Sequence, residues 1–222
     1  MNVDKRKQLF ARLRQQNPAP ATELRYDGPF QLLVAVILSA QATDRSVNAA
    51  TAGLFKVAPG PAEMVALGVR GIKAHIRRIG LFNTKARHVL ETSKQLLARH
   101  NGQVPADRQA LEALPGVGRK TANVVLNTAF GEPTIAVDTH IFRVANRMGL
   151  APGRSVAEVE RKLIRVVPVE YRSNAHHWLI LHGRYVCTAR RPKCGGCVVA
   201  DLCEYRGKVA SHLCQTESPR QA

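Results

Sequence analysis

The sequence predicts an all-α protein, and three observations support this fold class. Apolar side chains recur at helical spacing along most of the chain. Glycine, proline and asparagine stand where these apolar patterns stop, as they do at the ends of helices. No run of alternating apolar and polar residues is long enough to predict a strand, and the chain has no internal repeat. With 222 residues and 45% hydrophobic residues, the chain can form one large domain or two small domains with apolar cores.

The first helices have distinct characters. Residues 3–16 predict a basic amphipathic helix, which Pro18 and Pro20 then break. Residues 29–42 are apolar nearly all round, which predicts a buried helix. Thr43 follows, and its hydroxyl can cap the N-terminus of the next helix.

Stop signals delimit the remaining helices. Two short helices end before Gly68 and Gly80, and a longer one ends at Asn101 and Gly102. The complete set of predicted helices is 3–16, 29–42, 43–58, 61–67, 72–79, 83–100, 107–114, 119–131, 138–148, 155–166 and 170–187.

The charge of the chain points to a polyanionic partner. The sequence holds 33 basic and 16 acidic residues, a formal net charge of +17. Nucleic acid is the first interpretation and an anionic membrane surface the second, although charge alone does not exclude a merely basic soluble protein. The longest apolar run, 32–38, is far shorter than the ~20 residues that cross a bilayer. With no secretory signal in the sequence either, we expect a cytoplasmic protein that does not enter a membrane.

A glycine-rich turn is the central motif of the chain. Leu114-Pro115-Gly116-Val117-Gly118 leads directly into Arg119 and Lys120. Proline fixes φ and ends the preceding helix, and the two glycines allow backbone angles that a side chain would penalise. We therefore expect two helices joined by a tight turn with free amide N–H groups. Such a turn at a helix N-terminus suits a phosphate group.

The five cysteines all lie near the C-terminal end of the sequence. Cys187, Cys194, Cys197 and Cys203 have the spacing C-x6-C-x2-C-x5-C, and Cys214 follows outside this motif. Clustering at one end favours a metal centre over a disulfide framework. Four thiolates in so short a loop suit an iron–sulfur cluster or a tetrahedral zinc ion, and the spacing alone leaves both open. A set with Cys214 in place of Cys187 is possible but less compact.

Together, these motifs resemble those of a known family. Residues 114–122 resemble the helix-hairpin-helix of base-excision DNA glycosylases. With Lys120, Asp138 and the four cysteines, residues 3–208 resemble the bacterial endonuclease III family, which contains iron and sulfur. The resemblance implies a bifunctional DNA glycosylase and abasic-site lyase that removes oxidised pyrimidines. The implied partner is double-stranded DNA with a damaged base or an abasic site. We expect a monomer in the cytoplasm, associated with the nucleoid.

The resemblance also implies a division into domains. Residues 21–132 would form a six-helix domain that contains the hairpin. Residues 1–20 and 133–208 would form a second domain, in which the four cysteines hold a [4Fe-4S] cluster. The DNA cleft would lie between the two domains, with the lysine and the aspartate facing each other across it. Residues 209–222 turn polar and lose periodicity, which predicts a flexible tail.

Lys120 and Asp138 have ordinary interpretations when each is taken alone. Lys120 could be a surface lysine that contacts phosphate, and Asp138 could be a helix N-cap. The resemblance implies that Lys120 is the nucleophile at the sugar C1′ and that Asp138 is the catalytic carboxylate. A helix N-terminus repels a cation, and burial makes charging it costly. Both effects would lower the pKa of Lys120 and favour the neutral amine that can form a Schiff base.

The resemblance implies three groups of DNA contacts. Gln41 and Leu81 would fill the gap that a flipped nucleotide leaves, although taken alone they predict a polar helix end and a core residue. The other two groups are the hairpin turn and the loop between the first two cysteines, where a cluster would present cations to phosphates. Their residues are Gly116, Val117, Gly118, Arg119, Arg190, Arg191 and Lys193.

Three rival functions remain to be compared with this one. An adenine glycosylase of the same superfamily lacks the lysine, uses water and usually carries a catalytic glutamate at the helix end that here reads Ser39-Ala40-Gln41. A non-catalytic hairpin module would bind DNA without cutting it. A structural zinc protein on nucleic acid would hold no iron.

Overall fold

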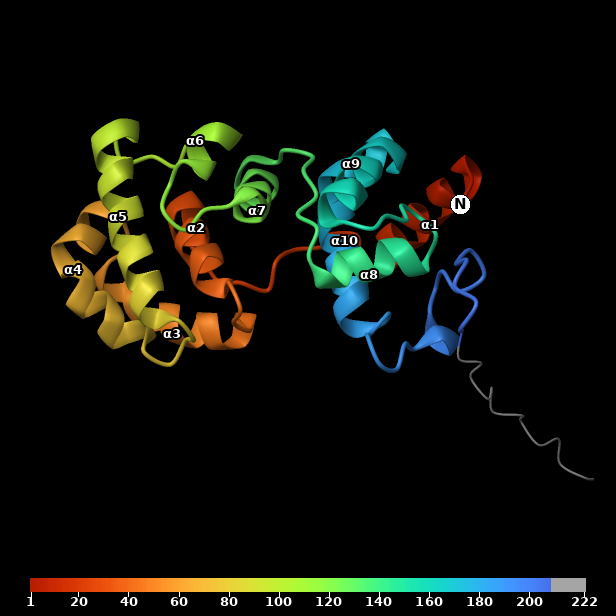
Figure 1. Cartoon of the computed structure of the whole chain (residues 1–222), viewed down its shortest axis with the longest axis horizontal. Coiled ribbons are helices and arrows are strands. Elements are labelled where there is room, and N and C mark those ends of the chain that lie inside the picture. The colour runs from red at the N-terminus through yellow and green to blue at the C-terminus, as the bar shows by residue number, and fades with distance from the viewer. Residues whose placement is uncertain (209–222) are drawn as a thin grey trace, which may run out of the picture. The chain divides into compact units, whose positions relative to one another are not determined.

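The computed structural model describes residues 1–208 and shows a helical protein (Figure 1). The described residues contain α-helices and short 3-10 helices but no strand, so the all-α prediction is confirmed. The predicted tail, 209–222, and Cys214 within it lie outside the described residues.

The helices have the following bounds, with 3-10 helices written η: α1 (Val3–Gln16), α2 (Gly28–Ser39), α3 (Asp44–Val57), α4 (Pro61–Ile76), α5 (Phe82–His100), α6 (Arg108–Glu112), α7 (Arg119–Phe130), α8 (Thr139–Arg147), α9 (Val156–Val166), η1 (Val169–Tyr171), α10 (Arg172–Tyr185) and η2 (Cys194–Gly196).

The chain divides into two compact units. The central unit is residues 21–136, and the terminal unit combines residues 1–20 with residues 137–208 of the described chain. The resemblance placed the boundary at residue 132. The hairpin turn belongs to the central unit and the cysteine loop to the terminal unit.

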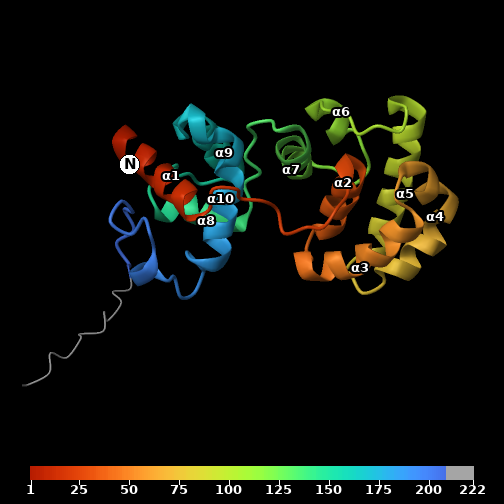
Figure 2. The same ribbon diagram turned by 180° about the vertical axis from the view of Figure 1, so that it is seen from behind.

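The core of the central unit surrounds α2. This helix buries nearly every side chain from Phe30 to Leu38, as its apolar sequence predicts. It packs against α3, α5 and α7, and α4 lies along α5 in both views (Figures 1 and 2). The last predicted turn of α2 is missing, since Ala40 has an extended ψ of 116° and Gln41 a φ of 55°.

Two helices predicted in this unit follow each other directly and share the label α4. We expected separate helices at 61–67 and 72–79, but α4 runs from Pro61 to Ile76. Gly68 interrupts it with φ 67° and ψ 172°, which glycine adopts without a steric penalty. The predicted stop at Gly68 is therefore confirmed, but the second helical stretch begins directly after it and ends at Ile76, so both of its bounds come earlier than predicted.

The terminal unit joins the first helix to the last ones. Phe10 of α1 stacks on Tyr171 at 5.7 Å between ring centroids and lies 6.4 Å from Trp178 of α10. The indole N–H of Trp178 donates to the carbonyl of Asn17 at 2.8 Å. These contacts bury the apolar face that the spacing in 3–16 predicts. No helix within residues 1–208 is both long enough and apolar enough to span a membrane.

Candidate functional site

The hairpin turn lies between α6 and α7 and is fastened to α5. Leu114 is buried, and the carbonyl of Pro115 accepts a hydrogen bond from Thr92 Oγ1 at 2.9 Å. Gly116 has a φ of 77°, and a β-carbon there would lie 2.7 Å from His88 Nδ1. Both facts require glycine at this position.

The amide groups of the turn are not all free, contrary to the prediction. The N–H of Val117 donates to the carbonyl of Leu114 at 3.1 Å, which closes the turn. The Val117 side chain is also buried, at 6% exposed, so it can contact DNA only through its backbone. Gly118 is the N-cap of α7, and Gly118 and Arg119 are both exposed.

Lys120 lies in the first turn of α7 and is exposed. The expectation that this amine is buried is therefore wrong. The reason is the helical register: α7 buries Ala122, Val125 and Leu126 against the central unit, and Lys120 lies outside that face. Its amine is accessible to a substrate.

Asp138 caps the N-terminus of α8. Its Oδ1 accepts hydrogen bonds from the N–H groups of His140 and Ile141, both at 2.8 Å. The capping interpretation is confirmed, and it leaves Oδ2 without a hydrogen bond among the described residues. The side chain is half-buried and belongs to the terminal unit, whereas Lys120 belongs to the central unit.

Gln41 and Leu81 share an unusual backbone conformation. Their φ angles are 55° and 60°, and within residues 1–208 the only other non-glycine residue with a positive φ is Asn101. Asn101 is the C-cap of α5, where this conformation is common. Gln41 is exposed and directly follows Ala40, the C-cap of α2, so its interpretation as a polar helix end is confirmed. Leu81 is 60% exposed, so its interpretation as a core residue is wrong. An exposed leucine with a positive φ at a helix N-cap is a strained feature of the kind that concentrates at functional sites.

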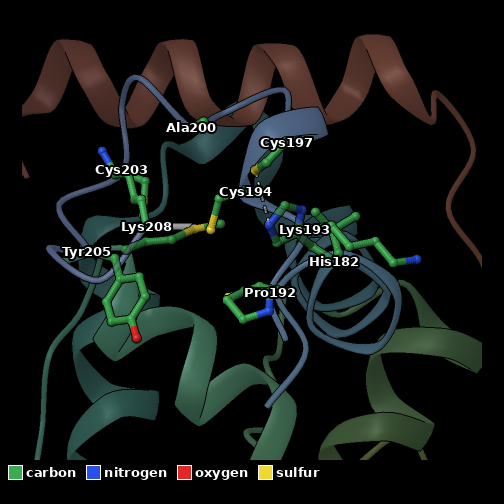
Figure 3. Close-up of a pocket in the computed structure, with 12 residues that line it drawn as sticks. His182, Pro192, Lys193, Cys194, Cys197, Ala200, Cys203, Tyr205 and Lys208 are labelled. Carbon is green, nitrogen blue, oxygen red and sulfur yellow. Dashed lines mark hydrogen bonds between the residues drawn. The ribbon is translucent and has the colours of Figure 1, made fainter. Parts of the chain in front are cut away.

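The four cysteines of the motif line one hollow in the terminal unit (Figure 3). All four are free thiols, and they come from the end of α10, from η2 and from the loop that follows. No three cysteine, histidine or acidic side chains within residues 1–208 are grouped to hold a single metal ion. The donor set suits a cluster, in which each thiolate ligates a separate iron atom.

The thiols that line the hollow are partly buried, which disfavours their charged form. Burial raises the pKa of Cys197 and of Cys203, and the neighbouring cysteines raise it further because thiolates repel one another. Bound iron would remove this penalty by neutralising the thiolates. Arg147 Nη1 lies 3.8 Å from Cys187 Sγ. His182 Nε2 lies 3.8 Å from Cys197 Sγ (Figure 3).

The basic loop between the first two cysteines is held by the chain itself. Arg147 donates to the carbonyls of Thr188 and Ala189 at 2.6 and 2.7 Å. Thr188 Oγ1 donates to the carbonyl of Arg191 at 2.6 Å, across the loop. The three predicted DNA-binding side chains of this loop are exposed: Arg190, Arg191 and Lys193.

Sequence reasoning did not find the two arginines that hold this loop. Arg143 and Arg147 are one helical turn apart on α8, and Arg143 donates to the carbonyls of Cys187 and Gly183 at 3.0 and 2.7 Å. Their i, i+4 spacing was the available signal, since it puts both side chains on one face of the helix.

The comparisons with known proteins agree with this site. Residues 34–168 match the model of the HhH-GPD superfamily base excision DNA repair protein, and residues 187–203 match the iron-sulfur binding domain of endonuclease III. Over 209 residues the chain is 63% identical to endonuclease III of Escherichia coli strain K12, covering 94% of this chain and 99% of the relative. The chain belongs to the endonuclease III family.

Other members of the endonuclease III family give the same picture. The relative in Haemophilus influenzae is 61% identical over 94% of this chain and 99% of its own length. A solved structure of a trapped endonuclease III–DNA covalent intermediate is 42% identical, with a TM-score of 0.85, covering 92% of this chain and 96% of the other. The iron–sulfur model covers all four cysteines of the motif, so the cofactor is the [4Fe-4S] cluster and the zinc interpretation is set aside.

Proposed function

We propose that Lys120 and Asp138 carry out the chemistry of this chain, a DNA glycosylase and abasic-site lyase of base excision repair. The observation that supports the proposal most is the exposed amine of Lys120 directly after a hairpin turn suited to phosphate. We further propose that the substrates are oxidised pyrimidines in duplex DNA and that the protein acts as a monomer in the cytoplasm, on the nucleoid.

The reaction begins with attack by the neutral amine of Lys120 on C1′ of the damaged nucleotide. A bond forms between Nζ and C1′, and the glycosidic bond breaks with its electron pair leaving on the base. The new ammonium gives a proton to the departing base. The C1′–O4′ bond then breaks, O4′ keeps its electron pair and takes up a proton, and the nitrogen lone pair forms a protonated imine between Lys120 and C1′. The imine acidifies C2′, so loss of a proton there expels the 3′ phosphate and cuts the strand.

Asp138 stabilises the positive charge that develops on the sugar. Its Oδ1 is committed to the cap of α8, so Oδ2 is the oxygen that serves this role. The cap also fixes the rotamer of the carboxylate, which aids catalysis because the charge is oriented before the reaction.

The substitution Asp138→Asn removes the negative charge of this side chain and keeps its ability to cap α8, so it tests the two roles separately. Asparagine caps as well as aspartate, so we expect the free energy of unfolding to change by less than about 0.5 kcal/mol. Base release should fall by about 10²- to 10⁴-fold, because the charge that stabilises the transition state is lost. Single-turnover kinetics measure this loss, with Asp107→Asn, the cap of α6, as the control. Equal losses in the two variants would reject the catalytic role.

Gln41 and Leu81 fill the space left by the flipped nucleotide. Both are exposed and held in a strained conformation, and the wholly apolar side chain of Leu81 is 60% exposed. An apolar side chain exposed to this extent gains free energy when it enters a base stack.

The cations of the loop between Cys187 and Cys194 bind the DNA backbone. The cluster holds both ends of that loop in place and takes no part in bond breaking.

Arg191→Ala keeps the hydrogen bond from Thr188, since that bond goes to the backbone carbonyl. We expect weaker binding to all sequences and a salt dependence flattened by about 0.9, the value for one phosphate contact. Titrations at several salt concentrations test this, with exposed Arg165 on α9 changed to alanine as the control. A slope equal to that of the control removes Arg191 from the interface.

Borohydride trapping tests the proposed function as a whole. The substrates are duplexes with a single thymine glycol or a single abasic site. A covalent adduct on both and strand cleavage at the site are the expected results. Base release without an adduct would indicate a water-using glycosylase, and binding without either would indicate a non-catalytic module.

A further inference from the structure

Lys85 is a buried, positively charged residue that has no role in the proposed mechanism. It lies in the first turn of α5 and is 4% exposed. Its Nζ donates to the carbonyl of Leu38 at 2.9 Å and to that of Ala40 at 2.6 Å, so neither partner is a carboxylate. Burial lowers the pKa of Lys85, which shows that keeping the charge here is costly. The two carbonyls at the end of α2 offset part of that cost, because a helix C-terminus attracts a cation.

The bonds of Lys85 reach both residues proposed to fill the lesion gap. Its side chain bonds the carbonyl of Ala40, and the next residue is Gln41. Leu81 is the N-cap of α5, and its carbonyl accepts the first helical hydrogen bond from the N–H of residue 85 at 3.0 Å, so the Lys85 side chain starts one turn from Leu81 and ties that end of α5 to the end of α2. Gln41 and Leu81 both have positive φ, so both backbones need support from their surroundings. The Lys85 side chain therefore links the helix that begins at Leu81 to the carbonyl directly before Gln41.

We propose that Lys85 is a positioning residue that fixes the backbones of Gln41 and Leu81 relative to each other, so that both side chains enter the lesion site together. The inference rests on the proposed gap-filling role of those two residues. A methionine would fill similar space but would leave two buried carbonyls without a donor.

Helix α5, which contains Lys85, also contacts the hairpin turn. Thr92 lies two turns after Lys85 on α5 and donates to the carbonyl of Pro115 in the turn. His88, between them, packs against Gly116. Residues 85, 88 and 92 recur at helical spacing, so one face of α5, the helix that begins after Leu81, contacts both the end of α2 and the phosphate-binding turn.

The test compares Lys85→Met in two backgrounds, the natural chain and the double variant Gln41→Ala, Leu81→Ala. The readout is the single-turnover cleavage rate on a duplex with one abasic site. In the natural background we expect a loss of about 10- to 100-fold, as for other small misplacements near a reacting centre. In the double-variant background the further loss should be less than about twofold, because residues that act through one another are not additive.

Lys94→Met is the matched control, since Lys94 is an exposed lysine on the same helix, paired with Glu91 at 2.8 Å. It should leave the rate unchanged in both backgrounds. A second readout is the fluorescence of 2-aminopurine opposite a stable abasic analogue at saturating protein. The fluorescence rises when the opposite base unstacks. Lys85→Met should reduce this rise to the same extent as the double variant does.

If Lys85→Met does not fold, Lys85→Gln replaces it in the same comparison, because glutamine keeps an N–H donor.

The outcomes separate the two hypotheses. Equal losses from Lys85→Met in both backgrounds would show a general structural role and overturn the inference while the gap-filling role stands. Full rates and full fluorescence in the double variant would reject the gap-filling role itself, and the inference with it.

Discussion

Lys120→Ala is expected to eliminate the borohydride adduct and strand cleavage together, by about 10⁴-fold or more, as for other removed covalent nucleophiles. The lysine supplies the atom that bonds to C1′, and alanine offers no amine. Because Lys120 is exposed and lies on the side of α7 away from the core, its loss should not disturb the fold. Binding to an abasic-site duplex should weaken by no more than about tenfold, the effect of one lost cation at moderate salt.

Retained binding is what makes the Lys120 experiment decisive. A variant that binds duplex DNA but forms no adduct has lost chemistry and not structure. Lys94→Ala serves as the control, because Lys94 is an exposed lysine of the same unit. An adduct of normal yield in Lys120→Ala would show that another amine attacks the sugar.

Cys197→Ser is expected to release the cluster. Serine is a poor ligand for iron, and the three remaining thiols would have to hold the core alone. Iron content and visible absorbance should be lost. The melting temperature should fall by about 10 °C, because a group bound only by the folded state contributes to its stability. The basic loop would lose its two fixed ends, so weaker DNA binding should accompany the loss of iron.

Cys214→Ser is the control for the cluster experiment, because Cys214 lies outside the four-cysteine motif. It should keep its full iron content and its colour. Iron bound in normal amount by Cys197→Ser would contradict the assignment of Cys197 as a ligand. Iron lost in Cys214→Ser would point instead to the less compact set that includes this residue.

Patterns within a few residues determined much of this protein from its sequence. The helices follow from apolar spacing and stop signals, and α1 has the predicted bounds because Asn-Pro-Ala-Pro allows no continuation. Thr43 caps α3, since this interaction depends only on the next few backbone groups. The cysteine motif predicted a metal centre because four thiols in one short loop must lie close together. These features need no information from distant parts of the chain.

Packing between distant segments decided the rest. No local pattern shows that Lys120 is exposed, that Leu81 leaves the core, or that Gln41 has a positive φ. Each depends on which helix covers which face, and that arrangement minimises the free energy of the whole unit. Lys85 is the clearest case, since its bonds join α5 to the end of α2. In the sequence it is one basic residue among 33, and only the fold shows that it is buried against two carbonyls.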